Sequence, residues 1–196
     1  MLVITLHGFG MTGEGDELCQ EINTLAKQHG HVGLTPTYPT NNPHLAHVYL
    51  THYTESKLEY HKMGAIFIGH SLGGFWARHL AKTFGASSLV LINPALHPWD
   101  SLQPYIGPNR NSCTGGAFEL ATNDVAAHYV YRGDDSDTAI ARVKTLLVAT
   151  KNSSTDVIEL FSDVRNVDVD IIDGYDGIIP SIERNIFPKE EDESEI

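Results

Sequence analysis

The sequence predicts an α/β fold: a mostly parallel sheet of about six strands with helices on both faces. Six short, β-branched apolar segments are bounded by turn residues, which is typical of strands buried inside a parallel sheet. Longer segments of helical type lie between them, and this alternation predicts crossover helices that keep the strands parallel. With 196 residues, of which 41% are hydrophobic, the chain has the size and apolar content of one ordinary domain.

The predicted strands are Leu2–Leu6, Val32–Thr35, Ala65–Ile68, Ser88–Ile92, Thr145–Ala149 and Val167–Ile172. The predicted helices between them are Gly15–His29, Pro43–His61, Leu72–Phe84 and Asp156–Asp163. Pro43 suits a first helical turn, where its missing N–H would have no partner, and Asp156 suits a helix N-terminus because its carboxylate meets the helix dipole. Tyr49, Tyr53 and Tyr60, spaced by four and seven residues, predict a core-facing stripe on the second helix.

One long stretch, from about 97 to 144, is rich in Pro and Gly and has little periodicity. A connection of this length in a compact domain is usually a lid or a binding loop. The last eight residues hold five acids and one lysine, so we expect the tail 188–196 to be disordered. The prediction is one domain over residues 1–187 with a lid-like insert.

The formal net charge of −12 and the absence of a basic run exclude several classes of partner. Nucleic acids and anionic membranes bind clustered cations, so neither is an expected partner. No apolar run is long enough for a membrane-spanning helix. The two cysteines, Cys19 and Cys113, predict neither a disulfide framework nor a thiolate metal site. We therefore expect a cytoplasmic protein with no metal and no cofactor.

The segment with the most chemical information is Gly69-His70-Ser71-Leu72-Gly73, which joins an apolar strand to a helix. Such a turn is so tight that bulky side chains at Gly69 or Gly73 would clash. The turn displays the serine at the end of the strand, near the positive end of the next helix. The N–H of the leucine then points to where an oxyanion would form. Ser71 is the predicted nucleophile and Leu72 a predicted oxyanion donor.

A second motif, His7-Gly8-Phe9-Gly10, follows the first predicted strand directly. In this arrangement the loop after that strand supplies the second oxyanion donor, and the N–H of Phe9 is the candidate. We expect His7 to shape the loop rather than to carry a proton, with Gly8 beside it.

These motifs resemble those of the α/β-hydrolases and, more narrowly, of the small bacterial YqiA-like esterases. The resemblance rests on Leu6–Phe9, Gly69–Phe75 and Leu91–Ala95, with Pro98 after them. Since the spacing of the later strands also fits, it covers about residues 1–187. It implies an α/β-hydrolase fold and an esterase-like activity through Ser71 on a small-molecule ester.

The chain departs from the family pattern at the two partners of the serine. Such enzymes carry an acid after the fifth of these strands and a histidine after the last one. Here residues 150–152 read Thr-Lys-Asn, and residues 173–177 read Asp-Gly-Tyr-Asp-Gly. The family's histidine would fall on Gly177, or on Asp176 after a slip of one residue. Both partners of Ser71 are therefore replaced.

Two residues are candidates for a substitute base. His128, the last histidine of the chain, lies in the insert, which can fold over the serine. Asp176 lies in the last loop, although a carboxylate base needs burial to raise its pKa. His70 adjoins Ser71, but its side chain is expected to point into the packed side of the turn. Asp156 is an alternative for the acid, competing with its role at a helix N-terminus.

Two functions stay open. The favoured one is a serine hydrolase with an unorthodox triad, acting on a small carboxylic ester or thioester. The alternative is a catalytically inactive pseudo-hydrolase that binds a ligand or a protein partner. A serine hydroxyl is a poor nucleophile without a base, and general-base help is worth about 10²–10⁴-fold. The side chains around the Ser71 hydroxyl therefore decide between the two.

Overall fold

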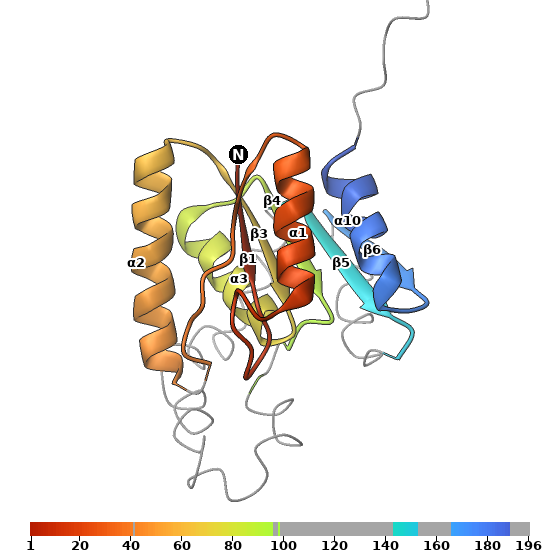
Figure 1. The fold of residues 1–196 in the computed structure, drawn as a ribbon, viewed down its shortest axis with the longest axis horizontal. Helices are drawn as coiled ribbons and strands as arrows, with labels where there is room; N and C mark the ends of the chain where they lie inside the picture. Colours follow the sequence, from red (N-terminus) through yellow and green to blue (C-terminus); the bar gives the residue numbers. More distant parts are fainter. Residues whose placement is uncertain (41, 96–97, 99–142, 153–165, 189–196) are drawn as a thin grey trace, which may run out of the picture.

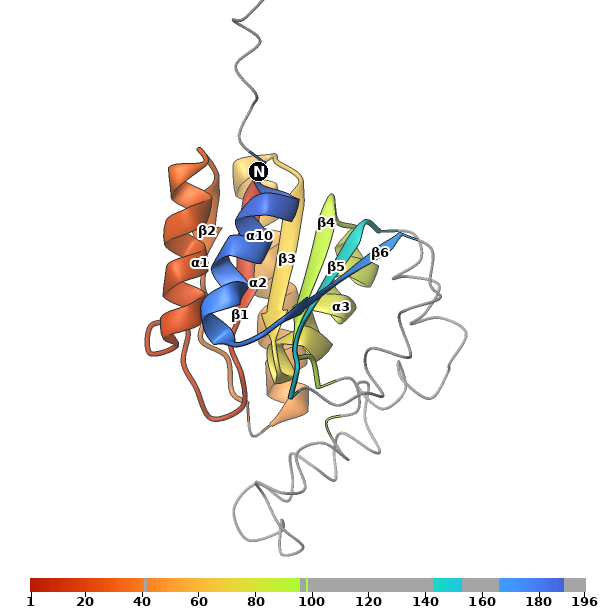
Figure 2. The same ribbon diagram turned by 90° about the vertical axis from the view of Figure 1, so that its right-hand side faces the viewer.

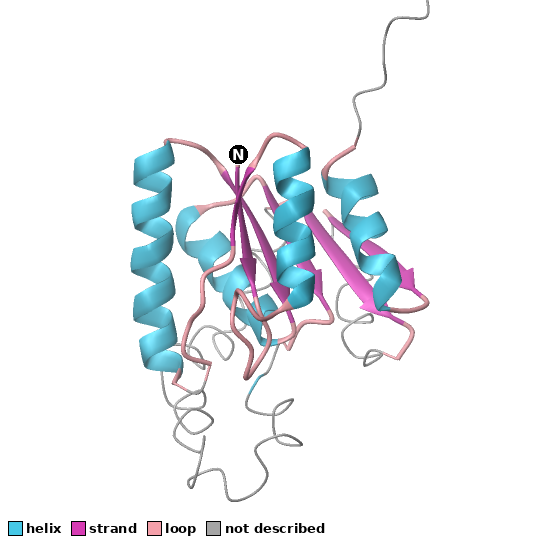
Figure 3. Ribbon diagram, viewed as in Figure 1, coloured by secondary structure: helices cyan, strands magenta, loops and turns pink. Residues whose placement is uncertain are grey.

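The computed structural model describes residues 1–40, 42–95, 98, 143–152 and 166–188. In these residues six strands form one sheet in the order β2-β1-β3-β4-β5-β6. Every pairing is parallel (Figure 3). The strands are β1 (Leu2–Leu6), β2 (Val32–Leu34), β3 (Ala65–His70), β4 (Ser88–Ile92), β5 (Thr145–Thr150) and β6 (Val167–Ile172). The predicted fold class is confirmed.

Helices cover both faces of the sheet (Figures 1 and 2). They are α1 (Glu17–Gln28), α2 (Pro43–His61), α3 (Leu72–Phe84) and α10 (Ile178–Ile186), with the short 3₁₀ turn η2 (Tyr175–Gly177) just before α10. In β1, Leu2, Ile4 and Leu6 join the core beneath α2 and α3, whereas Val3 joins the core beneath α1 and α10. This alternation is the period of two that a strand imposes, and it gives the molecule two cores, one on each face.

Side-chain caps fix where two of the helices begin. The Asp16 carboxylate accepts a hydrogen bond from the N–H of Cys19 at 3.1 Å, so α1 begins just after it. The Asn42 side chain accepts from the N–H of Leu45 at 3.1 Å, and Pro43 takes the first position of α2 as predicted. The predicted bounds of α2 and α3 are confirmed.

The predicted tyrosine stripe on α2 is wrong. Tyr49 is 40% exposed and Tyr60 is 81% exposed, so neither belongs to the core. The buried face of α2 instead carries Ala46, Leu50 and Thr54, one turn apart. Because α2 has apolar residues around much of its circumference, its sequence pattern does not say which side packs on the sheet.

Several predictions concern residues outside the described ranges. These are the helix Asp156–Asp163, most of the insert with His128, and all but the first residue of the tail. Within the described ranges, no helix combines the length and the apolar character needed to cross a membrane.

The topology places the candidate site at the carboxyl ends of the strands, the lower edge of the sheet in Figure 1. The chain leaves β1 toward β2 on one side and later returns to β3 on the other side of β1. In open parallel sheets, ligands bind where the strand order reverses in this way. The ends of β1 and β3 carry His7 and Ser71, so the two sequence motifs meet at this point.

Candidate active site

Ser71 occupies the corner between β3 and α3 in an uncommon backbone conformation. Its φ of 52° and ψ of −118° fall in a region that costs about 1–3 kcal/mol for a residue with a side chain. Three backbone hydrogen bonds hold it there. The N–H of Ser71 donates to the carbonyl of Ile92 at 3.0 Å, and its own carbonyl accepts from Gly74 at 2.9 Å and Ala95 at 2.8 Å. Strain of this kind, held by the surrounding structure, is typical of a nucleophile elbow.

The two glycines that flank the serine are sterically required. A β-carbon on Gly69 would lie 2.1 Å from the carbonyl oxygen of Gly73. A β-carbon on Gly73 would lie 2.0 Å from the carbonyl oxygen of Leu6, at the end of β1. Both contacts are with backbone atoms that cannot rotate away, so the close approach of α3 to the sheet depends on these glycines.

The segment Asn93–Ala95 after β4 supports the elbow from the other side. The Asn93 side chain accepts from the N–H of Thr150 at 3.0 Å and donates to its hydroxyl at 3.3 Å, which ties β4 to the end of β5. A β-carbon on Gly74 would lie only 2.6 Å from Cβ of Pro94, so the proline ring packs directly on the elbow. The sequence analysis used this segment only as one motif of the family resemblance and did not predict that it supports the elbow.

The loop after β1 lies alongside Ser71, as the sequence predicts. A β-carbon built on Gly8 would be 3.6 Å from Cβ of Ser71, an ordinary contact distance. The N–H of Leu72 belongs to the first turn of α3, where no intrahelical acceptor exists. Phe9 is half-buried and packs against the core beneath α2 and α3. The arrangement thus brings the two candidate donor segments to the same serine.

His7 is fully buried and works as part of the scaffold. Its Nδ1 lies 2.9 Å from the carbonyl oxygen of Gly8, and its Nε2 lies 3.3 Å from the N–H of Tyr38. Because Nε2 accepts from that N–H, the ring proton sits on Nδ1 and donates to Gly8. The Tyr38 hydroxyl donates to the His7 carbonyl at 2.7 Å, and the two rings stack with centroids 4.3 Å apart. Burial lowers the pKa of His7 and keeps its ring neutral.

His70 is half-buried and lies between two loops of the site. Its Nε2 lies 3.4 Å from the hydroxyl of Tyr175, and the two rings meet edge to face with centroids 5.9 Å apart. Its Nδ1 is buried and has no hydrogen-bond partner among the described residues. Burial is the main cause that lowers the pKa of His70, so the ring is neutral at pH 7. Nδ1 is thus on the packed side of the turn, whereas Nε2 meets the exposed Tyr175.

The turn at the end of β5, where the family resemblance implies an acid, is polar. Lys151 forms an ion pair with Asp173 of the last loop, and its N–H donates to the carbonyl of Ile172 at 3.0 Å. Lys151 holds the pKa of the exposed Asp173 below its ordinary value, first through the hydrogen bond and then through its charge. Asn152 is exposed. The ion pair and the backbone hydrogen bond join the described starts of the loops after β5 and β6.

The turn η2, just before α10, is where the family resemblance implies a histidine. Gly177 has ordinary helical angles, with φ of −78° and ψ of −13°, so no backbone strain requires glycine there. Asp176, a candidate base, is exposed. The residue of this loop that reaches the elbow is Tyr175, which the sequence analysis did not single out. Around the elbow, the side-chain hydrogen bonds among described residues are those of His70 with Tyr175 and of Asn93 with Thr150.

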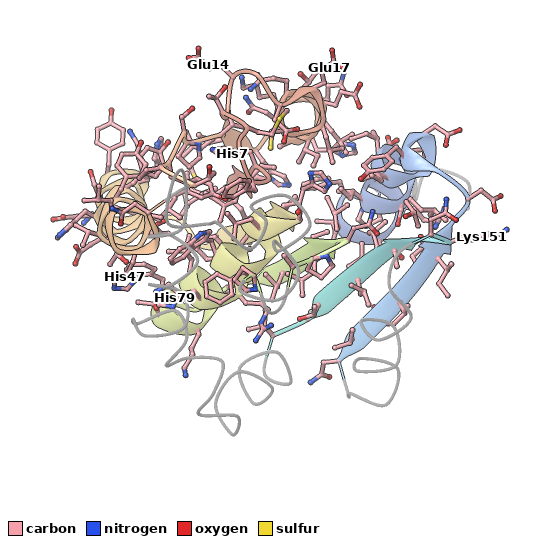
Figure 4. All side chains as sticks on the ribbon, turned by 90° about the horizontal axis from the view of Figure 1, so that it is seen from below. His7, Glu14, Glu17, His47, His79 and Lys151 are labelled. Carbon is pink, nitrogen blue, oxygen red and sulfur yellow. The ribbon has the colours of Figure 1, made fainter. Side chains whose placement is uncertain are left out.

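The described residues do not suggest a metal centre. His47 and His79 lie side by side between α2 and α3, with ring centroids 4.8 Å apart (Figure 4). Within the ranges the structure describes, no group of three His, Cys, Asp or Glu side chains is arranged to hold an ion. The same figure places this pair away from Lys151, at the other side of the sheet.

The buried histidines predict a loss of stability in mild acid. Burial lowers the pKa of His79 to about 3, so this ring stays neutral in the folded state, and burial also lowers the pKa of His7, whereas unfolded histidines take up protons near 6.5. The unfolded state then binds more protons, and each buried histidine removes up to about 1.4 kcal/mol per pH unit below that value. Urea unfolding between pH 7.5 and 5.5, where carboxylates stay ionised, should show a falling free energy of unfolding.

The slope should become smaller in a His79→Leu variant and stay unchanged in a His52→Gln variant, since the His52 side chain is 76% exposed. A free energy of unfolding that is flat over this pH range in the native protein would contradict the assignment of neutral buried rings.

Solved structures of similar fold cover most of this chain. S-formylglutathione hydrolase from Staphylococcus aureus matches with a TM-score of 0.64 and 17% identity, over 93% of this chain and 81% of that one. Est1E from Butyrivibrio proteoclasticus gives a TM-score of 0.67 and 14% identity, over 93% and 85%. MGS-MChE2, an alpha/beta hydrolase enzyme from a sediment metagenome of the lagoon of Mar Chica, gives 0.59 and 16%, over 88% and 80%. At these identities the likeness shows the fold.

The sequence itself matches a protein family over residues 2–171, which is most of its length. The match begins with β1 and ends inside β6, so it includes both motifs at the serine and residues 150–152, and it stops before residues 173–177. The chain therefore has the α/β-hydrolase fold and belongs to the family described as "Uncharacterised protein family (UPF0227)".

Proposed function

We propose that this protein is a serine hydrolase that cleaves a small carboxylic ester or thioester. Ser71 is the nucleophile, and the N–H groups of Phe9 and Leu72 are the oxyanion donors. The observation that carries the proposal is the strained backbone of Ser71 at φ 52°, held between two glycines that admit no side chain. A protein that used this turn only as a connection would gain nothing from the strain.

The chemistry follows from the position of the serine. Its oxygen attacks the carbonyl carbon of the ester, and the two N–H groups stabilise the negative charge that develops on the carbonyl oxygen. The alcohol or thiol leaves with a proton, and the acyl group stays on Ser71. Water then attacks the acyl-enzyme, releases the acid and restores the serine hydroxyl.

The base in this proposal is unorthodox. Asp176 is exposed, so it lacks the burial that turns a carboxylate into an effective base near neutral pH. His128 of the insert remains the other candidate from the sequence. Without any base, an oxyanion hole and substrate binding still accelerate hydrolysis by about 10³–10⁴-fold over water. The proposed hydrolase can therefore be slow and still be an enzyme.

The comparisons support a hydrolase and leave its type open. A similar structure is a hydrolase of S-formylglutathione, and another is a monoacylglycerol lipase from Paleococcus ferrophilus, at 17% and 15% identity. Neither substrate transfers to this chain at such distances. The acceptance of an ester or thioester is thus proposed from the elbow and the oxyanion loop.

A second candidate is a pseudo-hydrolase that binds a small molecule or a protein partner. The observation in its favour is the pair of altered positions, with Lys151 and Asn152 at the place of the acid and Gly177 at the place of the histidine. Lys151 also forms an ion pair with Asp173 of the last loop, and this contact has no role in a catalytic triad.

One experiment separates the two candidates. The native protein is treated with a fluorophosphonate probe and assayed with p-nitrophenyl acetate. We expect covalent labelling that disappears in Ser71→Ala and stays in Ser56→Ala, which removes an exposed serine of α2. Folding of each variant is checked by circular dichroism. Absence of labelling in folded native protein would favour the pseudo-hydrolase, and labelling that persists in Ser71→Ala would remove this serine from the proposal.

A further inference from the structure

His70 lies between two loops that come from opposite ends of the sequence. On one side, a β-carbon built on Gly8 would be 3.7 Å from Nδ1 of His70, so the ring lies beside the loop after β1. On the other side, Nε2 of His70 faces the hydroxyl of Tyr175 at 3.4 Å. The same Gly8 position borders Cβ of Ser71 at 3.6 Å. One imidazole therefore connects the loop after β6 to the loop that carries the Phe9 N–H.

The contact with Tyr175 is mainly one of ring against ring. The planes of the two rings are 88° apart and their centroids 5.9 Å apart, the edge-to-face geometry that aromatic pairs prefer. The polar contact of 3.4 Å is longer than an ordinary hydrogen bond of about 2.7–3.2 Å. Because Nδ1 has no acceptor among the described residues, the proton of the neutral ring belongs on Nε2, which donates to the Tyr175 oxygen. The Tyr175 hydroxyl therefore contributes less to the contact with His70 than the Tyr175 ring does.

Tyr175 is not held in place as a core residue. It is 59% exposed, and it also lines an open groove of about 470 Å³ between α1 and α10. Core packing therefore does not explain why Tyr175 lies beside the elbow. It stands in the loop that carries the catalytic histidine in the resembling enzymes.

We propose that Tyr175 is a positioning residue for the oxyanion loop: it holds His70 beside Gly8 and so keeps the Phe9 N–H near Ser71. This inference rests on the proposed function, since it needs Ser71 to be the nucleophile. Removing the tyrosine ring frees His70 to move toward the groove, and the loop after β1 then loses the side chain that backs it. The Phe9 N–H stabilises the charge that develops on the substrate oxygen in the transition state. Loosening it should therefore lower kcat and leave KM unchanged.

The size of the effect follows from what is lost. Removing an oxyanion donor outright costs about 10²–10³-fold in kcat. Loosening a donor that is still present costs less, and we expect Tyr175→Ala to lower kcat and the rate of fluorophosphonate labelling about tenfold. Tyr175→Phe keeps the ring contact and should stay within about threefold of the native protein.

The chain offers a matched control. Tyr60 of α2 is 81% exposed and meets the neighbouring His61 edge to face, with centroids 4.8 Å apart and planes 86° apart. Tyr60→Ala therefore removes an exposed tyrosine–histidine pair at a place that does not touch the elbow. It should leave labelling and kcat unchanged.

Residue-resolved modification of histidines by diethylpyrocarbonate gives a readout that does not need activity. We expect His70 to react faster in Tyr175→Ala than in native protein or Tyr175→Phe, and His61 to react faster in Tyr60→Ala. A Tyr175→Leu variant, which refills most of the volume without the ring edge, is measured beside the alanine variant. Loss of kcat in both, with unchanged melting temperature, supports positioning over a loss of folding.

Two results would overturn the inference and can be told apart. If native protein is labelled and Tyr175→Ala is labelled equally fast, the positioning role is wrong and the hydrolase stands. If native protein is not labelled at all, the hydrolase proposal itself fails, and an altered His70 reactivity in Tyr175→Ala then marks a purely structural contact.

Discussion

An Asn152→Asp, Gly177→His double variant is expected to hydrolyse p-nitrophenyl acetate about 10²–10⁴-fold faster than the native protein. The change returns an acid to the loop after β5 and a base to the loop after β6, where the resembling enzymes carry them. If the elbow and the oxyanion loop are intact, the missing proton acceptor is the largest remaining barrier, because a neutral serine hydroxyl attacks esters poorly.

The described geometry supports the two placements. The loops after β5 and β6 are neighbours, because Lys151 pairs with Asp173 and donates its N–H to the carbonyl of Ile172. The last loop also reaches the elbow, since Tyr175 touches His70. Gly177 has helical angles that any residue adopts. A β-carbon there would lie 3.0 Å from Cβ of Ile172, so the histidine needs a shift of a few tenths of an ångström.

Two controls make the result specific. Asn152→Asp alone supplies an acid without a base, and Gly177→Ala imposes the same contact with Ile172 without an imidazole; neither should gain activity. An Asn152→Asp, Asp176→His variant tests the alternative placement by one residue. If every folded double variant stays as slow as the native protein, the two loops do not carry the triad positions. If the native protein is already fast and the changes slow it, it has a base elsewhere.

Much of the fold could be predicted because the strands are short apolar runs between turn residues. β1, β4 and β6 have the predicted bounds, and α2 and α3 begin and end where the sequence indicates. The missed helix α10 is short and carries Pro180 near its start, which in a sequence suggests a break. A proline is tolerated in a first turn, where its missing N–H has no partner to lose. What makes this segment a helix is its packing, with Ile178 and Ile182 fully buried against the sheet.

The candidate site also has parts that the sequence predicts and parts that it does not. The corner at Ser71 and the loop after β1 are encoded locally, since glycine spacing and a strand–helix boundary suffice to indicate them. Contacts between distant segments leave no such pattern. Tyr175 and His70 lie 105 positions apart, and Asn93 and Thr150 lie 57 apart, so only the assembled sheet brings each pair together. The prediction for the tyrosines of α2 was wrong for a related reason. Regular spacing shows that residues share one face of a helix, but not whether that face packs on the sheet or is exposed to solvent.

The second large effect concerns stability. Gly69→Ala and Gly73→Ala are each expected to lower the free energy of unfolding by about 3 kcal/mol or more, at the high end for single substitutions. The new β-carbons would lie 2.1 Å and 2.0 Å from backbone carbonyl oxygens, so α3 must move away from β3 in the first variant and from β1 in the second. Against a typical total of about 5–15 kcal/mol, such a loss is visible in urea unfolding.

Gly64→Ala is the matched control. Its β-carbon would meet first the hydroxyl oxygen of Ser87 at 3.1 Å, a side-chain atom that can rotate away, and the change should cost no more than about 1 kcal/mol. Because the movement of α3 would also displace the N–H of Leu72, fluorophosphonate labelling should fall in whatever folded fraction of the two elbow variants remains. Elbow variants as stable as Gly64→Ala would mean that the turn around Ser71 is looser than its contacts indicate, and the strain at φ 52° would lose its support.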